Sequence, residues 1–173
     1  GVVDVLAYEE EGVYDLVYAR FLLAHLSDPE KCVGSMLKAC KPGGIIVIED
    51  IECAASFCYP RLPAYERYVE LYQQVLRRLG GNADIGPEIP GMLQRAGATG
   101  VQVNVVQPAH LEGAGKYMSP VTMRGVSATV VSEGLASQEE VERIAAELER
   151  AAADPRTMMS LPRIFQVWGR KPS

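Results

Sequence analysis

Two stretches of the chain carry consecutive apolar residues with no polar residue between them. The first lies within residues 14–19, and the second is the run 45–48. A strand covered on one face alternates apolar with polar side chains, whereas a strand covered on both faces does not. The pattern therefore predicts two buried strands that belong to a parallel sheet.

The segment between these two strands has the spacing of an amphipathic helix. Its apolar residues recur at intervals of three and four over residues 32–40, and Pro42 with the two glycines after it ends the pattern. Ser27 and Glu30 form a capping box, and Pro29 fits the first turn because that turn does not use its N–H. A helix between two parallel strands predicts a right-handed crossover unit.

Further along, the chain predicts more helices and two strands of a different kind. Helices are expected over four segments: 64–79, 87–96, 121–135 and the segment that opens with the capping box of Ser137 and Glu140. Residues 101–106 and 164–168 alternate apolar with polar side chains, which is typical of antiparallel or edge strands. The whole pattern predicts an α/β fold with a mostly parallel sheet, a C-terminal antiparallel strand and helices on both faces.

Composition and charge narrow the class of protein. The chain has 173 residues, of which 48% are hydrophobic and 23% charged, and a net charge of -5; these values fit a globular domain. The charge includes no block of lysine and arginine, so we expect neither nucleic acid nor a membrane as a partner. No apolar run reaches the roughly 18 residues that span a bilayer. We expect a soluble, cytoplasmic protein.

The side chains that bind metals are few and poorly spaced for a metal site. The chain has four cysteines and two histidines. Cys32 and Cys40 fall on an apolar helix face, where a thiol behaves as a small hydrophobe. Cys53 and Cys58 are too far apart for a C-x-x-C pair and have no histidine cluster beside them. We therefore expect no metal.

Polar residues that follow the two buried strands are the candidates for chemistry. In an open α/β sheet, ligands bind beyond the carboxyl ends of the strands. Arg20 and His25 follow the first strand, and Glu49, Asp50 and Glu52 follow the second. Each also has a simpler interpretation, namely a surface ion pair, a packed histidine or a solvated carboxylate. The residues alone leave both interpretations open.

Several short motifs extend this pattern: Tyr14-Asp15-Leu16-Val17, Ala24-His25-Leu26, Asp28-Pro29 and Lys41-Pro42-Gly43-Gly44. Together they resemble the fourth strand, the following helix and the fifth strand of class I S-adenosylmethionine-dependent methyltransferases. Residues 84–106 are similar to the next helix and strand of that family, and residues 163–172 to its final strand. The resemblance implies a Rossmann-like sheet and S-adenosylmethionine as the cofactor.

The resemblance also implies cofactor-binding residues. Asp4 stands where an acidic residue of the family accepts a hydrogen bond from the adenine amino group, and Val5 offers its backbone N–H to the same ring. Arg20 stands at the methionine end of the cofactor. An arginine there departs from the small or polar residue that the family often has.

The same resemblance places a second group of residues around the methyl acceptor. His25 and Glu49 are the candidate general bases, which the reaction needs only if the acceptor must lose a proton. Asp50 is a candidate substrate contact, together with Tyr68 and Tyr72 from the predicted helix 64–79.

The resemblance further implies a segment that this sequence does not contain. The family has a glycine-rich loop after its first strand, upstream of the position of Asp4. We therefore expect residues 1–173 to be one N-terminally truncated methyltransferase domain with a variable helical insert at 109–160. Without a neighbouring strand, the strand at 14–19 would have an unpaired edge, so we expect either a homo-oligomer or a separate N-terminal segment beside it.

These inferences predict an enzyme that transfers a methyl group from S-adenosylmethionine to a small molecule. Such a transfer depends mainly on holding the two reacting groups in line. One alternative is a non-catalytic α/β interaction or dimerisation module that no longer binds cofactor. Another is half of a nicotinamide-dependent dehydrogenase, but its G-x-G-x-x-G loop is equally absent and the Lys-Pro-Gly-Gly turn disfavours it.

Overall fold

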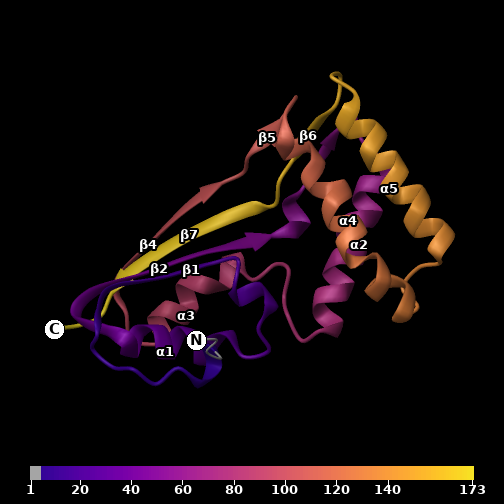
Figure 1. Ribbon diagram of the computed structural model, residues 1–173. Helices are drawn as coiled ribbons and strands as arrows, with labels where there is room; N and C mark the ends of the chain where they lie inside the picture. The colour runs from indigo at the N-terminus through magenta and orange to yellow at the C-terminus, as the bar shows by residue number, and fades with distance from the viewer. Residues whose placement is uncertain (1–4) are drawn as a thin grey trace. The chain divides into compact units, whose positions relative to one another are not determined.

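The structure, a computed structural model, describes residues 5–173 and divides into two compact units (Figure 1). The first unit takes in the described residues up to Glu52, together with 80–106 and 164–173. The second contains residues 53–79 and 107–163, so it includes the insert expected at 109–160 and a further segment before it. Asp4, a predicted cofactor residue, lies outside the described residues.

A four-stranded sheet forms the centre of the first unit. Its strands, in spatial order, are β1 (Tyr14–Arg20), β2 (Cys40–Glu52), β7 (Arg163–Arg170) and β4 (Thr99–Val106). β1 runs parallel to β2, whereas β4 runs antiparallel to β7. The strands with consecutive apolar residues thus form the parallel pair and the alternating ones the antiparallel pair, which confirms the predicted α/β fold.

Two helices, α1 (Pro29–Ala39) and α3 (Ile89–Arg95), lie against one face of this sheet (Figure 1). Short 3-10 turns accompany them: η1 (Val5–Ala7), η2 (Leu23–His25) and η4 (Gly86–Glu88). The covered face buries Ile46, Ile48 and Val167 completely. The sequence predicts helices on both faces, but among the described residues of this unit α1 and α3 cover only one.

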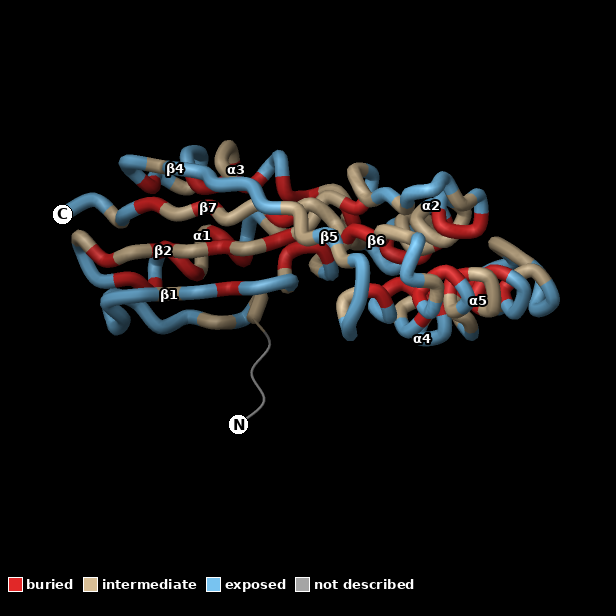
Figure 2. The backbone as a smooth tube through the Cα atoms, turned by 90° about the horizontal axis from the view of Figure 1, so that it is seen from above, coloured by how far each residue is buried: buried red, intermediate tan, exposed pale blue. Residues whose placement is uncertain are grey.

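The other face of the sheet leaves large apolar side chains exposed along its edge strand. Leu16 and Tyr18 of β1 are 55% and 52% exposed. Figure 2 shows the outer strands β1 and β4 as mostly exposed and the inner strands β2 and β7 as more buried. β1 is therefore an edge strand in the described part of this unit, with apolar residues on its uncovered face.

The first residue of α1 differs from the sequence prediction. The N-cap is Asp28, whose carboxylate accepts a hydrogen bond from the Lys31 N–H at 2.9 Å, so the capping box predicted for Ser27 is wrong. The reason is that Pro29 occupies the first helical position, and the residue directly before that position becomes the cap.

Three helices form most of the second unit: α2 (Pro63–Arg78), α4 (Met118–Ser132) and α5 (Gln138–Ala153), with the turns η3 (Cys53–Ala55) and η5 (Ala114–Tyr117). They enclose an apolar core that includes Leu71, Val130 and Ile144. The helices match the segments predicted at 64–79 and 121–135. The Ser137 hydroxyl accepts the Glu140 N–H at 3.1 Å, which confirms the predicted cap of α5.

A small antiparallel sheet completes this unit. Its strands are β3 (Cys58–Tyr59), β6 (Met158–Ser160) and β5 (Ala109–His110), in the order β3-β6-β5. The sequence did not predict these strands because two or three residues are too few to display a period of two.

A buried lysine ties the second unit together. Lys116 is only 1% exposed. Its Nζ donates to the carbonyl oxygens of Leu111, Asp154 and Thr157 at 3.2, 2.6 and 2.9 Å. Each of the three ammonium hydrogens therefore has an acceptor, as a buried charge requires.

Two kinds of site are absent from the described part of the chain. Residues 5–173 hold no group of three or more histidine, cysteine, aspartate or glutamate side chains placed to share a metal ion. Among the same residues, no helix combines the length and the hydrophobicity that crossing a membrane requires.

Replacing Leu148 with alanine is expected to lower the free energy of unfolding by about 2–5 kcal/mol, because this side chain is completely buried in the core around α5 and its truncation leaves a cavity. Urea denaturation followed by circular dichroism measures the change. The matched control is Leu79→Ala, which removes the same atoms from a side chain that is 68% exposed and is expected to cost less than about 0.5 kcal/mol. Equal losses in the two variants would contradict the packing of α5.

Candidate functional site

The polar residues predicted to follow the two buried strands lie at the end of the sheet where β1 and β2 finish. Arg20 and Glu49 are register partners at the carboxyl ends of β1 and β2. The next residue, Phe21, donates its N–H to the Glu49 carbonyl at 2.9 Å, and the turn η2 that carries His25 follows. Because ligands of open α/β sheets bind at this edge, it is the candidate site.

Glu49 is the centre of a polar row on the face that α1 and α3 do not cover. Its carboxylate accepts hydrogen bonds from the Tyr18 hydroxyl and the Gln166 amide, both at 2.6 Å, and lies 3.2 Å from the Arg20 Nε. The Asn104 amide extends the row by donating to Gln166 at 2.7 Å. One residue from each of the four strands thus takes part in a single hydrogen-bonded row.

These contacts determine the charge of Glu49. The hydrogen bond from Tyr18 lowers the pKa of the Glu49 carboxyl, and the Gln166 amide and the Arg20 charge lower it further. The same contact with the carboxylate raises the pKa of the Tyr18 hydroxyl. A carboxylate that has a lowered pKa and hydrogen bonds to both oxygens is a weak base. Glu49 is therefore better suited to positioning Tyr18, Gln166 and Arg20 than to accepting a proton.

Asp50 points to the opposite face of β2 and is completely buried. Its carboxylate accepts the backbone N–H of Ala24 at 3.1 Å and that of Ile51 at 2.9 Å. Burial raises the pKa of the Asp50 carboxyl. With its oxygens directed at backbone donors, Asp50 fixes the turn that carries His25 to the end of β2.

A second contact holds the same turn from the other side. The Asn82 N–H donates to the Ala24 carbonyl at 2.9 Å. A Cβ atom at Gly81 would collide with that carbonyl oxygen, so the close approach requires glycine. The backbone of Ala24 is thereby held at both its N–H and its carbonyl, while the neighbouring His25 side chain is exposed.

Phe21 has an unusual backbone conformation. Its φ of 51° makes it the one non-glycine residue with positive φ among residues 5–173. Its ring lies 4.7 Å from the Arg20 guanidinium carbon, a distance at which a cation and an aromatic face attract. Left-handed conformations of residues with a Cβ atom are strained and cluster at functional sites.

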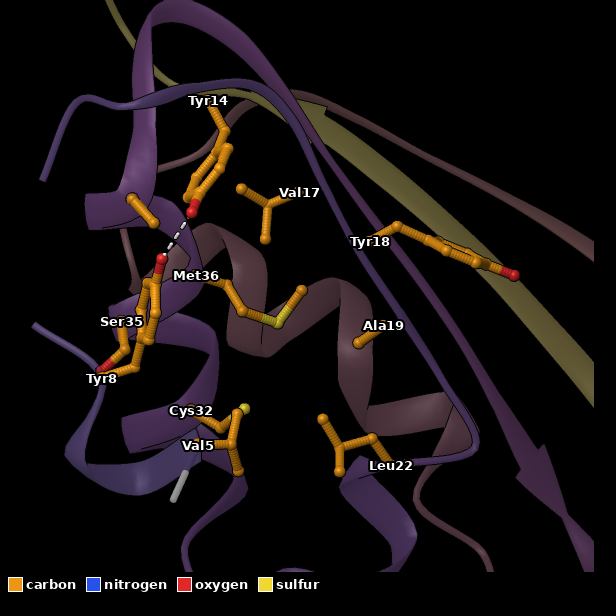
Figure 3. Close-up of a pocket in the computed structure, with 11 residues that line it drawn as sticks. Val5, Tyr8, Tyr14, Val17, Tyr18, Ala19, Leu22, Cys32, Ser35 and Met36 are labelled. Carbon is orange, nitrogen blue, oxygen red and sulfur yellow. Dashed lines mark hydrogen bonds between the residues drawn. The ribbon is translucent and has the colours of Figure 1, made fainter. Parts of the chain in front are cut away.

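Val5 lies beside an apolar cavity of about 220 Å³ between η1, β1 and α1 (Figure 3). Ala19 and Leu22, at the carboxyl end of β1, line the same cavity. Its other lining residues are mainly apolar or aromatic: Tyr8, Tyr14, Val17, Tyr18, Cys32, Ser35, Met36 and Ala39. Burial raises the pKa of the Cys32 thiol to about 11, so this cysteine stays a neutral, apolar wall. The predicted cofactor residue Val5 thus lies near the end of the strand that carries Arg20.

The two tyrosines predicted to contact substrate belong to the second unit. The Tyr68 ring packs edge-on against Tyr65 and at a tilt against Tyr72, with ring centroids 5.9 and 6.4 Å apart. Burial raises the pKa of the Tyr68 hydroxyl. Both side chains are partly buried on α2, and their contact with a substrate stays a prediction.

Sequence reasoning missed several residues of the site, among them Tyr18, Phe21, Gln166 and Asn104. Tyr18 looked like part of an apolar run, although its hydroxyl needs a partner. Gln166 was visible only as the polar member of an alternating strand. No sequence signal marks Phe21, because positive φ is unusual for an aromatic residue.

Replacing Asp50 with alanine is expected to lower the free energy of unfolding by about 1–3 kcal/mol, because the buried Ala24 N–H loses its acceptor. The pKa of Asp50 is raised in the folded protein, so its contribution is complete below the unfolded pKa and falls as the pH rises through the folded pKa. The window opens at the unfolded pKa of about 3.9, so urea denaturation at pH 3 and pH 8 should show the larger loss at pH 3. Asp15→Ala is the control, since that exposed carboxylate pairs with Lys41 at the surface. A loss of stability at position 15 as large as that at position 50 would contradict the role assigned to Asp50.

Phe21→Gly is expected to be more stable than Phe21→Ala by about 1 kcal/mol, because both remove the ring and only alanine keeps the left-handed strain. The same pair at Glu70, an exposed position within α2, should give the opposite order, since glycine weakens a helix by about 1 kcal/mol relative to alanine. Thermal and urea unfolding of the four variants measure both differences. An alanine variant at position 21 that matches or exceeds the glycine variant would rule out the left-handed backbone.

Comparison with known proteins identifies the fold. A family model described as a methyltransferase domain matches residues 3–103. A search of the curated proteins finds no match. A Bacillus halodurans protein assigned as a methyltransferase has a similar structure, with a TM-score of 0.58 and 13% identity, over 99% of this chain and 70% of its own.

Two further solved structures are similar. A protein from an antibiotic biosynthesis pathway of Anabaena variabilis, also assigned as a methyltransferase, has a TM-score of 0.55 at 18% identity over 93% of this chain and 68% of its own. Haemonchus contortus phosphoethanolamine N-methyltransferase 2 has a TM-score of 0.48 at 15% identity over 98% of this chain. The chain spans 36% of the length of that enzyme.

The matched residues 3–103 include β1, α1, β2 and α3, and therefore every residue of the candidate site except Gln166 and Asn104. The match extends over more than half of the chain, and the fold agrees with it. The chain belongs to the class I S-adenosylmethionine-dependent methyltransferase family.

Proposed function

We propose that this protein takes part in methyl transfer from S-adenosylmethionine to a small molecule, with the reaction at the carboxyl ends of β1 and β2. The observation that carries the proposal is the register pairing of Arg20 with Glu49 at those ends, followed by the turn that carries His25, within the segment that matches the methyltransferase domain. When bound, the cofactor supplies an electrophilic methyl group on a sulfonium. The work of the protein is then to hold the acceptor in line and to remove a proton where the acceptor carries one.

The residues beside the cavity at Val5 suit the adenine end of the cofactor. The cavity walls are mainly apolar, as the faces of an aromatic base require. Asp4, which lies outside the described residues, precedes Val5 in the chain, and the resemblance pairs its carboxylate with the Val5 N–H. We assign the adenine to these two residues, as the resemblance implies.

We assign the general base to His25 rather than to Glu49. An imidazole accepts a proton readily at neutral pH, and the His25 side chain is exposed on a turn that Asp50 and Asn82 hold in place. The Glu49 carboxylate has its oxygens engaged by Tyr18, Gln166 and Arg20. Glu49 therefore positions Arg20, and Asp50 positions the turn.

The acceptor is a small molecule in this proposal, and Tyr68 and Tyr72 remain its predicted contacts. The net charge of -5 supports neither nucleic acid nor an anionic membrane as a partner. The expectation that the edge of β1 pairs with a second copy or with an N-terminal segment stays a prediction. Light scattering over a series of protein concentrations measures self-association.

S-adenosylhomocysteine is expected to raise the melting temperature of the chain, because a ligand at about 100 times its Kd stabilises the folded state by about 2.7 kcal/mol. His25→Asn should keep this shift and lower methyl transfer to phenol or thiol acceptors by about 10²- to 10⁴-fold, since these acceptors must lose a proton. The control is His110→Asn, which changes the other histidine of the chain, in β5 of the second unit.

The alternative, a non-catalytic interaction module, predicts different results. Light scattering would show assembly that depends on protein concentration, and millimolar S-adenosylhomocysteine would leave the melting temperature unchanged. That result would contradict the proposed function. Equal methyl transfer by the His25 and His110 variants would contradict only the role of His25.

A further inference from the structure

The Arg20 guanidinium presents unused donors at the candidate site. Its side chain is 56% exposed, and its Nε lies 3.2 Å from the Glu49 carboxylate. Its two terminal nitrogens have no acceptor among residues 5–173. An arginine held by Nε alone keeps the planar pair of terminal NH2 groups free, and this fork matches the spacing of two oxygens of a carboxylate or phosphate.

The guanidinium contacts two groups that are themselves fixed. One is the Glu49 carboxylate, which accepts hydrogen bonds from the Tyr18 hydroxyl and the Gln166 amide. The other is the Phe21 ring, whose residue has a left-handed backbone and donates its N–H to the Glu49 carbonyl. Glu49 thus supports both contacts, one through its side chain and one through its backbone.

This arrangement goes beyond what a surface ion pair requires. An exposed pair of charges gains little and needs neither a strained residue nor a row of hydrogen bonds across the sheet. Three groups share the negative charge of Glu49, so Arg20 does not neutralise it alone. A fork with reduced side-chain freedom binds an anion at lower entropic cost than a mobile arginine.

We propose that Arg20 is an anion receptor, which binds a carboxylate or phosphate group of a ligand at the carboxyl ends of β1 and β2. The proposal rests on the proposed function for the identity of that ligand. Two sources carry this chemistry: the amino-acid carboxylate of the cofactor, and an acidic group on the methyl acceptor. In the second case the acceptors of this protein are small organic anions.

The first test uses inorganic phosphate and the fluorescence of Trp168. Trp168 is the single tryptophan of the chain, and it lies on β7 two residues from Gln166, on the same face of the sheet. Potassium phosphate is titrated against potassium chloride at equal ionic strength, so that screening is the same in both. The variants are Arg20→Gln, Arg20→Lys and the control Arg95→Gln, which removes an exposed arginine paired with Glu30 on the helix-covered side.

Phosphate is expected to change the fluorescence and raise the melting temperature of the wild type and of the Arg95 variant. Arg20→Gln should weaken the response by at least about tenfold, and Arg20→Lys by about threefold to tenfold, because lysine keeps the charge and loses the fork. Circular dichroism checks that the Arg20 variants keep the fold. An equal response from the wild type and Arg20→Gln, or no response in the wild type, would overturn the proposal.

The second test distinguishes the two sources. S-adenosylhomocysteine carries the amino-acid carboxylate, whereas 5′-methylthioadenosine lacks it. If Arg20→Gln weakens binding of the first by about tenfold and leaves the second unchanged, the anion belongs to the cofactor. If both affinities stay unchanged while the phosphate response is lost, the anion belongs to the acceptor. A wild type that binds phosphate through Arg20 but neither nucleoside contradicts the proposed function and leaves the anion receptor standing.

Discussion

The parallel pairing of β1 with β2 is the constraint on which the candidate site depends. Because the two strands run in the same direction, their carboxyl ends meet at one edge, and Arg20 lies opposite Glu49. Antiparallel pairing would send the residues after the two strands to opposite edges of the sheet. The helix α1 makes the parallel arrangement possible, because parallel strands need a long crossover connection.

Alternation along β2 then gives two adjacent carboxylates different tasks. Glu49 faces the uncovered side, where side-chain donors lower its pKa. Asp50 faces the helix-covered side, where burial raises its pKa and backbone N–H groups take up its oxygens. Two acids that look equivalent in the sequence thus differ in charge preference because they point in opposite directions.

The elements with long, regular patterns were predictable, and the contacts between distant segments were not. The strands at 14–19 and 45–48 and the helix at 64–79 have patterns long enough to identify them. The cap of α1 was assigned to Ser27 because the sequence has two possible caps in succession, and only the position of Pro29 selects Asp28. The partners of Glu49 depend on the register of three separate strands, which no local pattern contains.

Among the site residues too, some could be placed from a general rule and others could not. Arg20, His25, Glu49 and Asp50 could be assigned to one edge because a general rule of parallel sheets applies to them. Tyr68 and Tyr72 were assigned from the resemblance alone, and they belong to the second unit. The conformation of Phe21 results from the turn between β1 and η2 and is not a property of its residue type.

The hydrogen bonds of Lys116 have a consequence for transplanting the segment 107–163. The ammonium and its three carbonyl acceptors all lie inside that segment. The hydrogen bonds are therefore kept when the whole segment is transferred to another protein. A chimaera with a junction between residues 117 and 153 would take Lys116 from one protein and its acceptors at Asp154 and Thr157 from another. Junctions placed before residue 111 and after residue 157 keep the donor and its three acceptors together.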